Sequence, residues 1–145
     1  MQKNHSDAIR RINYLQSELD ALYHAASLRL GMPDSVSIVL YTVYDAGGEC
    51  LLSDICKASG VRKQTVNSAL RHLEEEGLLF LSRYDGRAKK AALTEKGRAY
   101  AARTVGRLFG AEEAAFGTWT DEETAAYLHY MEKYLLCFRR EVEKL

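Results

Sequence analysis

Apolar residues recur at every third or fourth position in two long stretches, one near each end of the chain. The first stripe comprises Ile9, Ile12, Leu15, Leu19, Leu22 and Ala26, and the second comprises Leu128, Met131, Leu135, Phe138, Val142 and Leu145. Each stripe predicts a long helix; Gly31-Met32-Pro33 ends the first, and the capping box Thr120-Asp121-Glu122-Glu123 begins the second. Because one small domain cannot easily cover two such seams, we expect residues 1–32 and 111–145 to be dimerisation helices.

The middle of the chain has shorter periodic stretches, which predict two helices in close succession. After a helix that Asp34 or Ser35 caps, Glu49-Cys50-Leu51 suggests a short strand, and a short helix then ends at Ser59-Gly60. A further helix runs from about Arg62 to Glu76, and the glycine turn before it lets the two helices cross steeply. The expected inward residues are Val36, Val39, Leu40 and Val43, then Leu52, Ile55 and Cys56 or Ala58, and finally Val66, Ala69, Leu70 and Leu73.

A hairpin signal follows this pair of helices. Gly77 stands where a helix C-terminal glycine belongs, Leu78–Leu81 forms a short apolar strand, and Asp85-Gly86 is a two-residue hairpin turn signal. Thr94 then caps a connecting helix over residues 94–118, which we expect to bend or break near Gly117. The predicted fold is mainly α with a small β-hairpin wing, in which residues 33–100 form a winged helix-turn-helix.

The outward face of the second helix of the pair is rich in groups that bind nucleic acid. It carries Gln64, Thr65, Asn67, Ser68 and Arg71, with Arg62 and Lys63 at its leading end. In a major groove, Gln and Asn pair with adenine, Arg pairs with guanine, and Ser, Thr and Lys hold phosphates. The alternative is an ordinary solvated helix face, and the helix alone does not decide between the two.

The hairpin supplies the context that favours DNA. Its tip is cationic, with Arg83, Arg87, Lys89 and Lys90 around Tyr84 and Asp85. A charge run is usually a solvated surface, but on a hairpin directly after such a helix it suits contacts to the phosphate backbone or minor groove. We therefore take Arg83, Asp85, Arg87 and Lys89, together with the helix positions above, as candidate DNA-binding residues.

Motifs in this region resemble those of the MarR family of bacterial transcription regulators. Asp85-Gly86-Arg87 is similar to the family's Asp-x-Arg wing motif, Leu93-Thr94-Glu95-Lys96-Gly97 to its Leu-Thr-x-x-Gly ending, and Leu73–Leu78 to the end of its recognition helix. The resemblance covers about Leu51 to Gly97. Two departures are a short segment between Gly77 and Asp85, which implies a stubbier wing, and Arg62 where members often carry a serine cap.

The resemblance implies a homodimer with N- and C-terminal dimerisation helices, which docks two recognition helices on an inverted repeat of double-stranded DNA. Its function would be that of a sequence-specific transcriptional regulator, and in particular a ligand- or stress-responsive repressor. Family members commonly accept small aromatic effectors in a cleft, for which the candidate lining residues are Tyr14, Tyr23, Tyr41 and Tyr44. The alternative for each tyrosine is that its ring packs the core with the hydroxyl at the edge.

Composition and charge narrow the class of protein. The chain has 145 residues, of which 47% are hydrophobic and 28% charged, as expected for one globular domain. Its net charge is zero, but residues 50–100 hold ten Lys or Arg against six Asp or Glu, a balance of +4 that the remainder offsets. No apolar run is long enough to span a membrane and no signal-peptide core is present, so we expect a cytoplasmic protein with no membrane partner.

The reactive side chains indicate neither catalysis nor a bound cofactor. The sequence has no phosphate-binding loop, nucleophile elbow or zinc-protease motif, so we expect no enzyme. His5, His24, His72 and His129 stand singly, which does not suggest a metal site, although some MarR relatives bind metals through His, Glu and Cys. Cys50, Cys56 and Cys137 lack metal-ligand spacing and are expected to be free, buried thiols rather than disulfides or oxidant sensors.

A second hypothesis, from another class, keeps the fold but changes the partner. In it the chain is a winged-helix protein-protein interaction module whose second helix binds protein, without sequence-specific DNA binding. An affinity for duplex DNA that falls steeply with salt distinguishes the regulator from this module.

Overall fold

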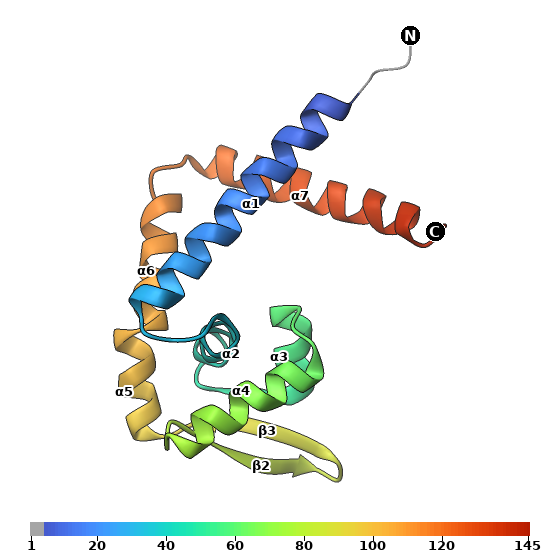
Figure 1. Cartoon of the computed structure of the whole chain (residues 1–145). Coiled ribbons are helices and arrows are strands. Elements are labelled where there is room, and N and C mark those ends of the chain that lie inside the picture. The colour runs from blue at the N-terminus through green and yellow to red at the C-terminus, as the bar shows by residue number, and fades with distance from the viewer. Residues whose placement is uncertain (1–4) are drawn as a thin grey trace. The chain divides into compact units, whose positions relative to one another are not determined.

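The computed structural model of the chain describes residues 5–145, which are mainly helical with one small sheet (Figure 1). In chain order the elements are α1 (Ser6–Arg29), α2 (Asp34–Asp45), β1 (Glu49–Leu51), α3 (Leu52–Ser59), α4 (Lys63–Glu75), β2 (Leu79–Asp85), β3 (Ala88–Leu93), α5 (Glu95–Arg103), α6 (Val105–Phe116) and α7 (Asp121–Val142). The chain divides into two compact units, one ending at Leu108 and the other spanning Phe109–Leu145. The first unit contains the helix-turn-helix and its sheet, which confirms the predicted fold class.

A proline sets the start of α2. Pro33 is extended, with φ −60° and ψ 149°, and it is the N-cap residue without any side-chain capping bond. Because the proline ring fixes φ, the helix begins at the next residue and Asp34 becomes its first helical residue, where its carboxylate faces the positive end of the helix dipole. The prediction that Asp34 or Ser35 caps this helix is therefore wrong.

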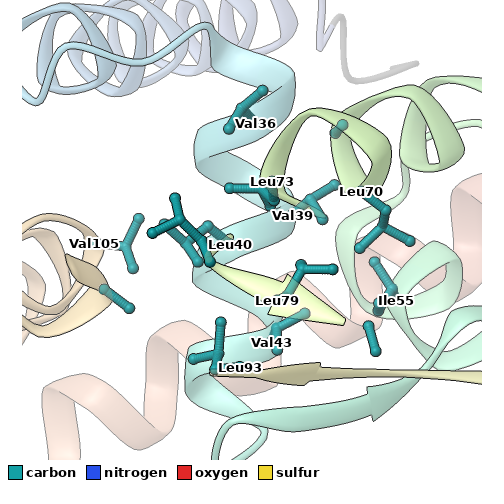
Figure 2. Close-up of a cluster of buried hydrophobic side chains, with 14 of the residues drawn as sticks. Val36, Val39, Leu40, Val43, Ile55, Leu70, Leu73, Leu79, Leu93 and Val105 are labelled. Carbon is teal, nitrogen blue, oxygen red and sulfur yellow. The ribbon is translucent and has the colours of Figure 1, made fainter. Parts of the chain in front are cut away.

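Helix α2 lies at the centre of the core of the first unit (Figure 2). Val39, Leu40 and Val43 are completely buried, which confirms the predicted inward face of this helix. Around them pack Ile55 of α3, Val66, Leu70 and Leu73 of α4, and Leu79 and Leu93 of the sheet. Truncating a fully buried leucine of this kind to alanine costs about 2–5 kcal/mol. The core therefore fixes the rotation of α4 and determines which of its residues face solvent.

The three strands form an antiparallel sheet in the order β1-β3-β2. Glu49 pairs with Ala92 and Leu51 with Lys90, so the strand predicted at Glu49–Leu51 is confirmed as an edge of the sheet. Lys90 Nζ lies 2.9 Å from Glu49 Oε2, which adds an ion pair between β1 and β3. The base of the hairpin is thus joined through β1 to the segment that connects α2 and α3.

The turn of the hairpin lies one residue later than predicted. Asp85 pairs with Ala88 across the two strands, which leaves Gly86 and Arg87 as the turn residues. Gly86 has φ 50°, whereas no non-glycine residue in the described range has a positive φ. This is the pattern of a type II′ turn, in which glycine takes the first central position at no steric cost. Asp85 therefore belongs to β2, and Arg87 stands at the tip.

The predicted connecting helix over residues 94–118 is divided into α5 and α6 at Thr104. Thr104 is buried, and its Oγ1 donates a hydrogen bond of 2.7 Å to the carbonyl of Tyr100. In a continuous helix that carbonyl would accept the N–H of Thr104 itself, so the hydroxyl competes with the helical hydrogen bond. The break expected near Gly117 is confirmed, because α6 ends at Phe116.

The second unit joins the end of α6 to α7 through aromatic contacts. The ring centroids of Phe116 and Trp119 are 4.9 Å apart, and those of Trp119 and Tyr127 are 5.4 Å apart. The predicted capping box of α7 is confirmed, since Thr120 and Glu123 each accept the backbone N–H of the other. Along α7, which is described in full, no residue is buried, so its apolar stripe is exposed in the single chain.

Candidate nucleic-acid interface

Helix α4 presents a polar face because its apolar face is fixed in the core. Its buried residues are Val66, Ala69, Leu70 and Leu73, as predicted. On the other side Gln64, Thr65, Ser68 and Arg71 are exposed, whereas Asn67 is half-buried. The Ser68 hydroxyl donates to the carbonyl of Gln64 at 3.1 Å, which orients it along the helix. The predicted residues of α4 are therefore gathered on one accessible side of a helix whose rotation is fixed.

The N-terminal end of α4 is positive for two separate reasons. Arg62 is the N-cap residue, Lys63 is the first helical residue, and the first turn has no acidic residue. The side chain of the N-cap residue makes no capping hydrogen bond to the backbone N–H groups there, and these groups carry the positive end of the helix dipole. Cations are disfavoured and anions are favoured at such an end, so this arrangement suits a phosphate.

The wing places two like charges opposite each other. Arg83 of β2 pairs directly with Lys89 of β3, and both side chains are exposed. Like charges that face each other across a strand pair are destabilising. Within residues 5–145 neither of them forms an ion pair. Together with Arg87 at the tip, they make a cationic cluster that an external anion would stabilise.

Two other charged residues of the hairpin are arranged differently. Lys90 is half-buried and pairs with Glu49, so its charge already has a partner within the chain. Its Nζ also lies 6.0 Å from the centroid of the Tyr84 ring. Asp85 is exposed at the end of β2, beside the turn. The cations that the wing offers to a partner are therefore Arg83, Arg87 and Lys89.

Contacts at the end of β3 fix the wing relative to α4. Thr94 Oγ1 donates to the carbonyl of Gly77 at 2.7 Å and accepts the backbone N–H of Gly97 at 2.9 Å. Gly97 packs so closely that a Cβ atom there would lie 1.7 Å from the carbonyl oxygen of Leu78. The Leu-Thr-x-x-Gly motif thus has a structural role, since it holds the start of α5 against the junction between α4 and β2.

Two further links between α4 and its neighbours were not predicted from the sequence. Glu74 Oε2 accepts the backbone N–H of Leu81 at 3.2 Å, and Lys96 Nζ donates to the carbonyl of Glu76 at 2.8 Å. In the sequence the acidic run at 74–76 looks like a solvated end of a helix. Only the folded position of β2 beside α4 gives Glu74 this partner.

The structure separates the tyrosines that were considered for an effector cleft. Tyr14 and Tyr23 are exposed on α1, and their spacing of roughly two and a half helical turns puts them on opposite sides of that helix. Tyr41 and Tyr44 are half-buried against the core. A Cβ atom on Gly106 would lie 3.0 Å from the Tyr44 hydroxyl, so this ring packs against the start of α6. Tyr41 and Tyr44 fit the core-packing alternative, and Tyr14 does not share a face with Tyr23.

The cysteines are free thiols, as predicted, but they are not all buried. Cys50 and Cys56 are half-buried, whereas Cys137 is exposed on α7, where a single helix has no second layer to cover it. Burial, and secondarily the carboxylate of Asp54, raises the pKa of the Cys50 thiol. Among the described residues no three His, Cys, Asp or Glu are placed to hold one metal ion, and no helix in that range is long and apolar enough to cross a membrane.

Comparison with known sequences and structures relates the chain to one family. A sequence model of the MarR family matches residues 30–88, whereas no curated protein matches the chain. A MarR family regulator from Neisseria meningitidis is 21% identical over 99% of each chain, with a TM-score of 0.80. The resemblance predicted from the wing and helix motifs is therefore confirmed.

Two other solved structures are similar and have known partners. BpsR from Bordetella bronchiseptica, whose DNA binding is regulated by 6-hydroxynicotinic acid, is 25% identical over 85% of this chain and 97% of its own, with a TM-score of 0.62. MepR from S. aureus, solved as a DNA complex, is 20% identical over 94% of this chain and 99% of its own, with a TM-score of 0.65. At such identities the likeness to MepR is one of fold.

Proposed function

We propose that this chain is a transcriptional regulator of the MarR family that binds double-stranded DNA sequence-specifically. The observation that carries the proposal is the wing, where Arg83 and Lys89 face each other and neither forms an ion pair with any of residues 5–145. That pairing is unfavourable for the isolated hairpin, and a polyanion removes the penalty. A protein-binding module has no comparable need for paired cations at this position.

The proposed reader is the exposed side of α4. Its positive N-terminal end, with Arg62 and Lys63, contacts the phosphate backbone and sets the register of the helix in the major groove. Gln64 and Arg71 then present forked donors and acceptors to base edges, while Thr65 and Ser68 bind phosphates or bases. Asn67 is half-buried, so it reads a base only where the groove approaches the helix closely.

The wing is proposed to contact DNA beside the helix. Arg87 stands at the tip, next to Gly86, so its guanidinium can approach the backbone or the minor groove without a bulky neighbour. Arg83 and Lys89 lie behind it and contact phosphates, and Asp85 flanks the turn at the end of β2. The fixed junction at Thr94 and Gly97 keeps these groups in register with α4.

We further propose that the regulator is a homodimeric, ligand- or stress-responsive repressor of an inverted-repeat operator. Two copies joined through their terminal helices would present two recognition helices about one helical turn of DNA apart. The DNA complex of S. aureus MepR supports DNA as the partner. The control of Bordetella BpsR by 6-hydroxynicotinic acid supports a small aromatic effector.

The test is a binding titration of the full chain on a DNA fragment from its own upstream region, at a series of salt concentrations. The wild-type affinity should fall steeply with salt. Arg87→Ala should weaken binding to all sequences and reduce the slope of log affinity against log salt by about 1. Gln64→Ala should instead relax the preference at one base pair, by about 1–3 kcal/mol.

Arg140→Ala serves as the matched control, because Arg140 is an exposed arginine of α7 and its loss changes the net charge equally. It should leave the affinity for DNA unchanged. Binding that does not depend on salt, or unaltered binding by both site variants, would refute the proposal and favour the protein-binding module.

A further inference from the structure

A pocket of about 450 Å³ opens on the first unit where the end of α2, strand β1, helix α3 and the wing meet. Its apolar wall includes Ala46, Leu51 and Ala58. The lining residues, all within the described range, include none of those proposed to contact DNA and none of the four tyrosines considered for an effector. The volume falls within the range of small-molecule sites, which is about 300–1,000 Å³.

The charges around this pocket are mainly negative. Asp45 of α2, Glu49 of β1 and Asp54 of α3 line it together with Lys90 of the wing. Lys90 neutralises Glu49, with 2.9 Å between Nζ and Oε2. Asp45 and Asp54 form no ion pair with any residue from 5 to 145. Two carboxylates from different helices are therefore left without a counter-charge at one pocket.

The end of α2 adds to the negative potential. Its last turn contains no basic residue, and Asp45 stands at the C-terminal end of the helix, where the dipole is already negative and cations are favoured. Arg98 donates to the carbonyl of Gly47 near this end at 3.4 Å, but it does not line the pocket. The raised pKa of the Cys50 thiol, caused first by burial and then by Asp54, keeps that lining residue neutral.

The shape of the site favours an extended cation over a metal ion. The carboxylates come from three different elements, and no three metal-ligating groups in the described range are gathered closely enough for one ion. The pocket instead combines separated carboxylates with an apolar wall. Tyr84, which also lines it, adds an aromatic ring to the apolar surface, and the Lys90 Nζ lies 6.0 Å from its centroid.

We propose that this pocket binds a small organic ammonium ion, whose charge interacts with Asp45 and Asp54 and whose apolar body lies against the wall and the Tyr84 ring. Because Tyr84 and Lys90 belong to the hairpin and the two aspartates belong to α2 and α3, the bound cation connects the wing to the helical core. This binding does not depend on the proposed function, since none of its residues is assigned to DNA.

The experiment compares two probes that share a phenyl ring and differ in charge, namely 2-phenylethylamine and 3-phenylpropionate. Calorimetric titration of the full chain should give saturable binding for the amine and none for the carboxylate. Asp45→Asn and Asp54→Asn should each weaken amine binding about threefold and together about tenfold, as expected for partly exposed charges. Tyr84→Ala should weaken it by a similar single step, because the apolar body of the amine loses its contact with the ring.

Glu75→Gln provides the control, since Glu75 is an exposed carboxylate of α4 that does not line the pocket. This variant should bind the amine as the wild type does, and amide resonances of Ala46, Asp54 and Tyr84 should shift during the titration. Equal binding of both probes, absence of amine binding, or an equal loss in Glu75→Gln would each overturn the proposal.

Discussion

At Gly97 the lack of a side chain allows the backbone of α5 to contact the carbonyl oxygen of Leu78 directly. We predict that Gly97→Ala destabilises the protein by about 1–3 kcal/mol, because the added methyl cannot be accommodated by rotating a side chain and the backbone must move. Denaturant unfolding followed by circular dichroism measures the change. Gly110→Ala is the control, since a Cβ atom at that position of α6 meets no atom within 4 Å.

The control substitution should be neutral or stabilise the protein by up to about 1 kcal/mol, because alanine is the better helix former. Equal effects of the two substitutions would show that the close contact with Leu78 does not affect the free energy of unfolding. The presence of glycine at 97 was clear from the motif in the sequence. Its physical reason was not, because the atom that a side chain would meet is the carbonyl oxygen of Leu78, nineteen residues earlier at the junction between α4 and β2.

Cys50 and Cys137 should differ in their reactivity towards alkylating agents. The raised pKa of Cys50 means that at any given pH near neutrality a smaller fraction of its thiol is thiolate, the reactive form. Its rate of alkylation should therefore begin to rise only at a higher pH than that of an ordinary thiol. Cys137 is exposed and should react first.

Mass spectrometry of the chain during treatment with iodoacetamide at several pH values identifies the modified residue. A Cys137→Ser variant should lose the fast phase and keep the slow one. Faster modification of Cys50 than of Cys137 at neutral pH would contradict this expectation. It would also reopen the possibility that Cys50 senses oxidants.

At the scale of elements, the spacing of apolar residues predicted which helix faces are buried. It did not predict two boundaries, which depend on individual hydrogen bonds and backbone angles. The faces of α2 and α4 were predictable because each buries residues at helical spacing. The break between α5 and α6 was not predictable, since it depends on the hydrogen bond that the Thr104 hydroxyl donates to the carbonyl of Tyr100. The turn position depends likewise on which residue of the hairpin accepts a positive φ.

The candidate interface was predictable as a set of residues but not as an arrangement of charges. The sequence placed Arg83, Lys89 and Lys90 together as cations of the wing. The pairing of the strands gives these cations different neighbours. Lys90 forms an ion pair with Glu49 of β1, whereas Arg83 and Lys89 face each other. A count of charges along the chain cannot distinguish these cases, since strand pairing decides which side chains are neighbours.

This like-charge pair leads to a prediction in which stability and binding change in opposite directions. Lys89→Glu converts the pair into an attractive one, so the free protein should gain about 0.2–1 kcal/mol in free energy of unfolding. The same change puts a negative charge where a phosphate is expected, and DNA affinity should fall at least tenfold. Thermal unfolding and a DNA titration on the same sample measure the two effects.

The double variant Arg83→Glu with Lys89→Glu supplies the control. It replaces one like-charge pair by another, so the gain in stability should disappear while DNA binding remains weak. If Lys89→Glu destabilises the protein or leaves DNA binding intact, the wing cations are ordinary surface charges.

At the scale of the whole molecule, the two terminal helices carry apolar side chains that the single chain leaves exposed. On α1 these include Leu15 and Leu19, and on α7 they include Met131, Leu135 and Phe138. Exposed apolar stripes of this length are rare on stable monomers and are typical of subunit interfaces. They agree with the proposal that two copies associate through their ends, which would also set the spacing of the two α4 helices.

Leu135 and Leu136 allow this proposal to be tested with two adjacent substitutions. Their exposed fractions in the single chain are nearly equal, at 55% and 54%, but roughly 100° of rotation along α7 separates them. Leu135 lies in the apolar seam, and Leu136 lies towards the polar side. Leu135→Glu should therefore weaken self-association by more than tenfold, because a charge would be buried at the interface without a partner, while Leu136→Glu should leave it nearly unchanged.

Analytical ultracentrifugation measures the dissociation constants of the two variants, and titration of each variant on the operator reports the consequence for DNA binding. A monomeric protomer binds one half-site and loses the contribution of the second, so the affinity of Leu135→Glu for the full operator should fall towards its affinity for half of it. A wild-type protein that is monomeric, or two variants that dissociate equally, would mean that something other than a second copy covers this seam.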